Sequence, residues 1–193
     1  MLFRSTHFAR ADETDIAPAR IQYEKFQEFL HALEEKGLSI PMKHCSNSAG
    51  IIRMQEANLD AVRAGIILYG LYPSPEVEQE PVPLKPLMSL RSHIAYIKTV
   101  EPGVEIRYGG IFTTTRKTRV ATIPVGYADG YARGLSNKGS VLIRGKRAPI
   151  LGRDQKDCIT MEELGDLSGR FNYEFACCIS KRVPRVYRET KQK

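Results

Sequence analysis

Apolar residues recur with helical spacing in the segment that follows Pro18. They fall at i, i+3, i+4 and i+7, as Phe26, Phe29, Leu30 and Leu33. This spacing places all four on one face of a helix. Pro18 suits the first turn of that helix, and Gly37 is positioned to end it. The pattern predicts an amphipathic helix between these two residues.

Shorter apolar runs surround this helix. Residues 2–9 have the pattern of a buried strand that ends at His7, and residues 40–45 and 61–64 predict two more strands. Between the last two, residues 47–50 open a short helix. The order β-α-β-α-β, with short polar turns after each strand, favours a parallel sheet of the α/β class.

The composition changes at Pro73. Five prolines lie between Pro73 and Pro86, interleaved with glutamates. Proline cannot extend a helix or occupy a central strand, so residues 73–86 predict a stiff, exposed linker. We therefore expect one domain over residues 1–72 and a second over residues 87–193.

The second half is patterned mainly as strands. Residues 87–100, 104–108 and 118–125 predict strands, and residues 140–151 predict a hairpin folded at residues 144–146. Thr160 and Glu163 have the spacing of a helix capping box, and Ser168-Gly169 would end that helix. Residues 171–187 predict further strands. We expect a mostly antiparallel β domain.

Charge and cysteine content narrow the function classes. The 29 Lys+Arg and 22 Asp+Glu residues give a net charge of +7, which would attract nucleic acid. No basic platform interleaved with aromatic residues accompanies it, so we favour a solvated surface with a pocket for an anionic cofactor. The four cysteines lack C-x-x-C spacing and suggest buried thiols, with Cys177 and Cys178 on alternate faces of a strand. With no membrane span or leader pattern, the sequence predicts a cytoplasmic protein without a metal site.

The strongest candidate chemistry lies in residues 60–73. Arg63 cannot lose its proton inside a protein, so it needs an acceptor wherever its strand is buried. One interpretation is a structural pair with a carboxylate; the other is a donor aimed at an aromatic nitrogen or an anion. Gly65-Ile66 follow at once, and Ser48 begins a helix, which suits phosphate binding at the C-terminal face of an α/β barrel.

Six spaced motifs share one resemblance. They are Thr6-His7-Phe8-Ala9, His44-Cys45-Ser46-Asn47-Ser48-Ala49, Val62-Arg63-Ala64-Gly65-Ile66, Tyr108-Gly109-Gly110, Val125-Gly126-Tyr127-Ala128-Asp129-Gly130-Tyr131 and Arg182-Val183-Pro184-Arg185. In this order they resemble the bacterial alanine racemases, which are fold-type III pyridoxal 5'-phosphate enzymes. The resemblance covers essentially the whole chain.

The resemblance implies the C-terminal strands of a (β/α)8 barrel, followed by a mostly antiparallel β domain, in a head-to-tail homodimer that acts on alanine. It implies that the cofactor phosphate is held by Ser48, Tyr173 and the N–H groups of Gly65 and Ile66. It places Arg63 opposite the pyridine nitrogen and Tyr127 beside the substrate.

By the same resemblance, Tyr108 is the catalytic tyrosine that enters the partner subunit's site, and His7 and Arg63 support it through hydrogen bonds. A free phenol has a pKa near ~10, so its use as a base at neutral pH requires nearby positive charge. Without the resemblance, Tyr108 has the pattern of a turn residue and His7 that of a structural histidine at a strand end.

Two departures from the family change what is expected. The family's Schiff-base lysine lies in a Lys-Ala-Asn-Ala-Tyr-Gly-His-Gly type of segment, and no such segment occurs here. A hairpin and a Met-Asp pair of the family are also missing, where Gly152-Arg153 runs straight into Asp154. We expect a truncated, internally deleted member that is inactive alone. The alternative is a non-catalytic dimerisation or complementation module for a separately encoded N-terminal half.

Overall fold

A computed structural model describes residues 3–80, 82–106, 112–150 and 159–188 of the 193-residue chain. The chain separates into two compact units, residues 1–89 and residues 90–193. Each unit is described by itself. Among the described helices, none combines the length and the apolar character needed to cross a membrane.

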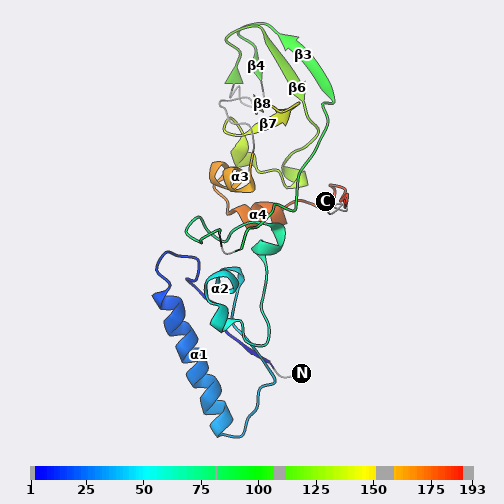
Figure 1. The fold of residues 1–193 in the computed structure, drawn as a ribbon. Helices are drawn as coiled ribbons and strands as arrows, with labels where there is room; N and C mark the ends of the chain where they lie inside the picture. The colour runs from blue at the N-terminus through cyan, green and yellow to red at the C-terminus, as the bar shows by residue number, and fades with distance from the viewer. Residues whose placement is uncertain (1–2, 81, 107–111, 151–158, 189–193) are drawn as a thin grey trace. The chain divides into compact units, whose positions relative to one another are not determined.

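The first unit combines two short parallel strands with two helices (Figure 1). Strand β1 (Phe3–Ser5) pairs in parallel with β2 (Met42–His44), and helix α1 (Ala17–Glu35) connects them. Helix α2 (Ser48–Arg53) follows β2 after a turn in which the Asn47 side chain accepts a hydrogen bond from the Gly50 N–H. The predicted parallel arrangement of the first two strands is confirmed.

Helix α1 ends as the sequence predicted and packs through a narrower stripe than expected. Phe26 and Leu30 are buried in a core shared with Phe8 and Cys45, whereas Phe29 is 47% exposed. Gly37 adopts φ 72°, a left-handed conformation that closes the helix. The prediction that Phe29 belongs to the buried face is wrong within this unit.

The third predicted strand, residues 61–64, is not a strand. The Asp60 N–H does donate to the Lys43 carbonyl, and the Arg63 N–H donates to the Ser46 carbonyl at 3.0 Å. However, the Asp60 carboxylate accepts the Lys43 N–H at 2.8 Å, where a strand would use a backbone carbonyl. The segment therefore runs beside β2 through isolated bonds and does not form a continuous ladder.

The proline-rich segment 73–86 packs on the first unit. The Tyr72 hydroxyl donates to the Gln79 and Val82 carbonyls and accepts the Leu84 N–H. Val77 is only 1% exposed, and the Leu87 N–H donates to the Tyr69 carbonyl at 3.0 Å. The expectation of an exposed linker is therefore wrong at Val77, which is buried, and the half-buried Tyr72 holds the segment through its hydroxyl.

The second unit contains three antiparallel strand pairs among its described residues. They are β3 (Tyr96–Val100) with β6 (Thr118–Thr122), β4 (Glu105–Ile106) with β5 (Phe112–Thr113), and β7 (Ser140–Ile143) with β8 (Lys146–Pro149). The antiparallel character is as predicted, and β3 and β6 are shorter than the apolar runs suggested. Arg144 and Gly145 both have positive φ, as a two-residue hairpin turn of type I′ requires, so the hairpin prediction is confirmed.

Two helices complete the second unit. Helix α3 (Met161–Ser168) starts at Thr160, whose side chain accepts the Glu163 N–H, and ends at Gly169 with φ 70°, both as predicted. Residues 172–177, expected to be strand, form helix α4 (Asn172–Cys177). Its buried residues Asn172, Phe175 and Ala176 lie at i, i+3 and i+4, which is a helical period.

The cysteine predictions are corrected by this helix. Cys177 ends α4 and is exposed, and Cys178 follows it half-buried, so the two do not alternate on a strand. Cys45 is buried as expected, and Cys158 lies outside the described residues. The described cysteines are free thiols.

Candidate functional site

Arg63 is the centre of the predicted site, and the fold places it beside the C-terminal ends of β1 and β2. Its Nη2 donates to the Thr6 carbonyl at 2.7 Å and to the Cys45 carbonyl at 3.0 Å. Its Nη1 donates to the His44 ring nitrogen Nδ1. No carboxylate pairs with Arg63 in the part of the chain that the structure describes. Among the described residues, Arg63 is therefore held by carbonyl groups and histidine rings, and the interpretation as half of a structural ion pair gains no support there.

The guanidinium lies against both histidine rings. Arg63 can only donate, and its Nη2 lies 3.3 Å from the His7 Nδ1. The Nδ1 atoms of His7 and His44 therefore both face a guanidinium donor. The structure thus brings together the predicted pair His7 and Arg63.

One donor of the guanidinium is left over. The two terminal nitrogens of Arg63 are engaged by carbonyls and rings, whereas its Nε–H has no hydrogen-bond partner among the described residues. A fixed cation with one uncommitted N–H can donate to an acceptor that lies in the plane of the guanidinium. An aromatic ring nitrogen is an acceptor of this kind.

Ser48, Gly65 and Ile66 form the second predicted group. The Ser48 Oγ accepts the Gly65 N–H at 3.0 Å, so the start of α2 and the segment after Arg63 lie in contact. Within the described residues, neither the Ser48 hydroxyl hydrogen nor the Ile66 N–H has a partner. The free donors of Ser48 and Ile66 lie beside the Gly65 N–H, which the Ser48 oxygen already accepts. Three such donors make a suitable cradle for a phosphate.

Two supporting residues were missed as site residues. Asn47 caps α2 and its Nδ2 donates to the Phe8 carbonyl at 3.1 Å, which ties the end of β1 to the helix that carries Ser48. His44 has no predicted role, although it lies within a motif of the family. Its position at the end of β2, next to the predicted Arg63, is the signal that could have identified it.

The remaining predicted residues lie in the second unit, which is described by itself, or outside the described residues. Tyr108 lies outside the described residues. Tyr173 belongs to α4 and Tyr127 to a 3-10 helix (Tyr127–Asp129), both in the second unit. The Tyr127 side chain is 76% exposed and Tyr173 is half-buried. Their roles in the site remain predictions.

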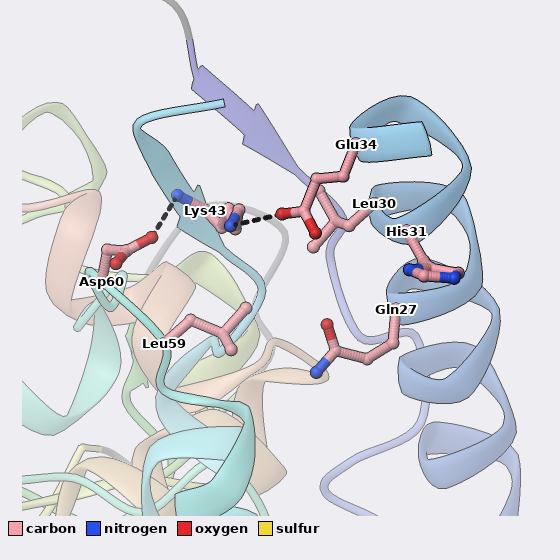
Figure 2. Close-up of a pocket in the computed structure, with 7 residues that line it drawn as sticks. All are labelled: Gln27, Leu30, His31, Glu34, Lys43, Leu59 and Asp60. Atoms are coloured by element: carbon pink, nitrogen blue, oxygen red, sulfur yellow. Dashed lines mark hydrogen bonds and ion pairs between the residues drawn. The ribbon is translucent and has the colours of Figure 1, made fainter. Parts of the chain in front are cut away.

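Lys43 precedes His44 on β2 but faces the other way. Figure 2 shows its ammonium group reaching toward α1, where its Nζ lies 3.1 Å from a Glu34 carboxylate oxygen. Lys43 and Glu34 line a pocket of about 390 Å³ with five other residues, Gln27, Leu30, His31, Leu59 and Asp60. Because neighbouring strand residues point to opposite faces, Lys43 is directed away from the Arg63 group.

Cys45 directly follows His44 in the sequence, and its thiol has low reactivity. Its Sγ donates to the Ala57 carbonyl at 3.0 Å, and burial raises the pKa of the thiol from its ordinary value of 9.0 to about 11. Among the described residues there is no cluster of three or more His, Cys, Asp or Glu side chains able to hold a metal.

We expect iodoacetamide at pH 8 to modify Cys177 in the native chain and to leave Cys45 unmodified, because only the thiolate reacts. The unfolded thiol ionises first, so the stability contributed by Cys45 is present below pH 9 and is lost as the pH rises toward about 11. Peptide mass mapping after labelling checks the first outcome and urea titrations at pH 8 and 10 check the second. Native modification of Cys45 as fast as Cys177 would contradict this prediction.

Comparison with known proteins gives consistent matches. The family model described as the alanine racemase N-terminal domain matches residues 4–73, and the model of the alanine racemase C-terminal domain matches residues 87–154. The second match ends where the sequence departs from the family pattern, after Gly152-Arg153. The chain is 43% identical to an alanine racemase of Methanococcus maripaludis over 209 residues, covering 94% of this chain and 56% of that protein.

Solved structures agree with the sequence matches. An alanine racemase of Clostridium difficile 630 in complex with cycloserine has a TM-score of 0.86 and 40% identity, covering 97% of this chain and 56% of that one. An alanine racemase of Bacillus anthracis with bound L-Ala-P has a TM-score of 0.90 and 36% identity, covering 97% and 55%. The chain thus spans about half the length of the relatives it matches.

Proposed function

The chain belongs to the alanine racemase family, and from this premise we propose that its first unit binds pyridoxal 5'-phosphate as part of a site that interconverts L- and D-alanine. The observation that carries the proposal is the set of uncommitted donors: the Ser48 hydroxyl, the Ile66 N–H and the Arg63 Nε–H. The names of the relatives support alanine as the substrate.

The residues present fit both polar ends of the cofactor. The donors of Ser48 and Ile66 suit its phosphate, and the Gly65 N–H joins them when it exchanges the Ser48 oxygen for a phosphate oxygen. Arg63 suits its pyridine nitrogen through Nε–H. Tyr173 would add a hydroxyl to the phosphate, as the family pattern implies.

Arg63 sets the electronic character of the site. When bound, the cofactor supplies an electron sink that acidifies the α-hydrogen of an amino acid. A guanidinium does not give its proton to a pyridine nitrogen, so Arg63 stabilises that nitrogen by donation alone and keeps the sink weak. The carbonyls of Thr6 and Cys45 and the two histidine rings hold the guanidinium in one orientation.

Proton transfer requires groups on both faces of the substrate. Tyr108 is the proposed group on one face, contributed across a homodimer, and His7 supports it. Tyr127 lines the substrate side of the site. These roles rest on the family pattern.

The lysine for the other face is the missing part of this proposal. No segment of the 193 residues resembles the family's lysine motif, and Lys43 faces α1. We propose that the 193-residue chain holds the cofactor without racemising alanine. Racemisation by the purified chain above the rate of free pyridoxal phosphate would refute this proposal.

The phosphate contact gives a direct test. We expect Ser48→Ala to weaken pyridoxal phosphate binding about tenfold, since one hydrogen bond to an anion is worth about 1.5 kcal/mol. The matched control is Ser46→Ala, which removes a buried hydroxyl bonded to the Ala57 carbonyl and leaves the cradle intact. Equilibrium dialysis with pyridoxal phosphate and with pyridoxal measures both. Equal weakening by the two variants, or equal affinity for the two ligands, would count against the cradle.

A second candidate function is complementation. The chain matches both family domains and spans about half the length of its relatives. We propose, as the second candidate, a module that assembles with a polypeptide carrying the lysine segment. Co-purification with such a polypeptide and restored racemisation would support it, and absence of association would oppose it. A cytoplasmic location and a (β/α)8 barrel completed in this way are parts of the proposal.

A further inference from the structure

Two of the family-like motifs meet in the second unit, and Tyr127 is their one residue with a proposed role in the site described above. One is the turn of residues 126–131, which carries Tyr127, and the other is the segment of residues 182–185. The Ser180 N–H, just before the second motif, donates to the Asp129 carbonyl at 3.0 Å. The two motifs therefore form one packed structure.

Asp129 connects the two motifs through its side chain as well. One carboxylate oxygen, Oδ2, accepts the Gly126 N–H at 2.9 Å and closes the turn across Tyr127. The other, Oδ1, lies 3.6 Å from the Arg182 Nε. The Asp129 side chain is 18% exposed and the Arg182 side chain is 69% exposed, so the carboxylate is the better-ordered partner.

The C-terminal side of this turn is fixed by packing. Gly130 has φ 94°, and a Cβ there would lie 2.1 Å from the Cys178 carbonyl oxygen. Tyr131 is half-buried, and its ring packs edge-on against Phe175 with centroids 6.2 Å apart. Only a glycine fits this approach, so the turn has little freedom on this side.

The Arg182 side is shaped by a third residue. Arg185 donates to the carbonyls of Ile179, Ser180 and Val183. These bonds fold residues 179–183 into a compact loop that presents the Ser180 N–H and Arg182 to Asp129. The loop thus forms a support for the turn.

The residue between these supports is exposed. Tyr127 is 76% exposed in a turn whose members Gly126, Asp129, Gly130 and Tyr131 are hydrogen-bonded or packed. Loops that carry functional side chains on a rigid scaffold have this character. We propose that Asp129 and Arg182 are positioning residues that fix the direction of the Tyr127 side chain; only the role of Tyr127 beside the substrate rests on the proposed function.

The proposal is tested on the full chain without cofactor or alanine, so its failure is distinct from failure of the proposed function. The chain is labelled with 3-fluorotyrosine, and the Tyr127 resonance is assigned with Tyr127→Phe. We expect Asp129→Ala to shift the Tyr127 fluorine resonance and to speed hydrogen exchange of the Gly126 amide about tenfold, while the Tyr131 resonance and the Tm stay within the wild-type range.

Three further variants separate positioning from general stability. Asp129→Asn keeps an oxygen that can accept the Gly126 N–H. It should therefore preserve the slow hydrogen exchange of the Gly126 amide and still shift the Tyr127 fluorine resonance. Arg182→Gln should shift Tyr127 without unfolding, because the arginine is mostly exposed. The matched control is Arg170→Gln, an exposed arginine paired with Glu174 at 3.9 Å, which should change neither readout.

The contradicting results are equally specific. An unchanged Tyr127 resonance in both Asp129→Asn and Arg182→Gln overturns the proposal. If Asp129→Ala lowers the Tm and moves every tyrosine resonance, the variant Arg182→Gln decides the question. A shift of the Tyr127 resonance alone in Arg182→Gln supports the positioning role. Spectra of Arg182→Gln that match those of Arg170→Gln overturn the proposal.

Discussion

Replacing Arg63 with leucine is expected to abolish pyridoxal phosphate binding and to lower the free energy of unfolding of the first unit by about 3 kcal/mol. The guanidinium donates to the carbonyls of Thr6 and Cys45 and to the His44 ring, so leucine leaves these acceptors without a charged donor. The half-buried setting of Arg63 reduces the loss below that of a fully buried charge.

Arg53→Leu is the matched control for this variant. Arg53 also donates to three backbone carbonyls, those of Ala11, Glu13 and Thr14, yet it lies at the end of α2 away from the cradle. We expect a similar loss of stability with cofactor binding retained at temperatures where the unit is folded. Arg63→Lys keeps the positive charge but loses the planar guanidinium with its paired N–H groups. We expect its stability and its cofactor affinity to lie between those of the wild type and those of Arg63→Leu. Urea titration and equilibrium dialysis measure the two effects, and cofactor binding by Arg63→Leu equal to that of Arg53→Leu would contradict the assignment.

Gly70→Ala is expected to have the largest effect on folding. Gly70 has φ 72°, and a Cβ there would lie 1.8 Å from the Lys85 carbonyl oxygen. A left-handed conformation costs an alanine about 1–2 kcal/mol, and the clash forces the segment around Lys85 off the first unit, for a total above about 4 kcal/mol. The Leu87 N–H would also lose its bond to the Tyr69 carbonyl.

The variant Gly37→Ala separates the cost of the left-handed backbone conformation from the cost of the steric clash. Gly37 has the same φ of 72°, and nothing lies within 4 Å of a Cβ built there. This control should lose only about 1 kcal/mol. Thermal and urea unfolding of the two variants gives the difference. Equal losses would show that the segment around Lys85 is not packed against Gly70.

Features with a local cause were predictable from sequence. The spacing around Phe26 and Leu30 determined α1, and Gly37 ended it, because both effects act within one helix. The cap at Thr160 and the hairpin turn at Arg144-Gly145 were equally local. In each case the residues that decide the structure are neighbours in sequence.

Features decided by distant contacts were not predictable in this way. Residues 61–64 have a strand pattern, but the Asp60 carboxylate replaces the backbone acceptor that a ladder would need. The sequence predicts strands over residues 171–187, whereas residues 172–177 form α4, which packs against α3 and buries residues with a helical period. Both outcomes depend on partners that lie elsewhere in the chain.

The residues of the candidate site show the same difference between local sequence signals and distant contacts. Arg63, Ser48, Gly65 and Ile66 were identified by their motifs, and the structure brings Ser48 and Gly65 into contact. The role of His44 was missed because it depends on a hydrogen bond to a residue 19 positions away. A side chain that acts by orienting another has no sequence pattern of its own.

The central claim is that this chain provides both polar ends of a pyridoxal phosphate site without a lysine to bind the cofactor covalently. Borohydride reduction of the 193-residue chain with pyridoxal phosphate, followed by peptide mass mapping, tests it most directly. The account predicts saturable cofactor binding by dialysis and no single preferred pyridoxyl-lysine among the reduced peptides. Stoichiometric labelling of one lysine, lost in Arg63→Leu, would contradict it.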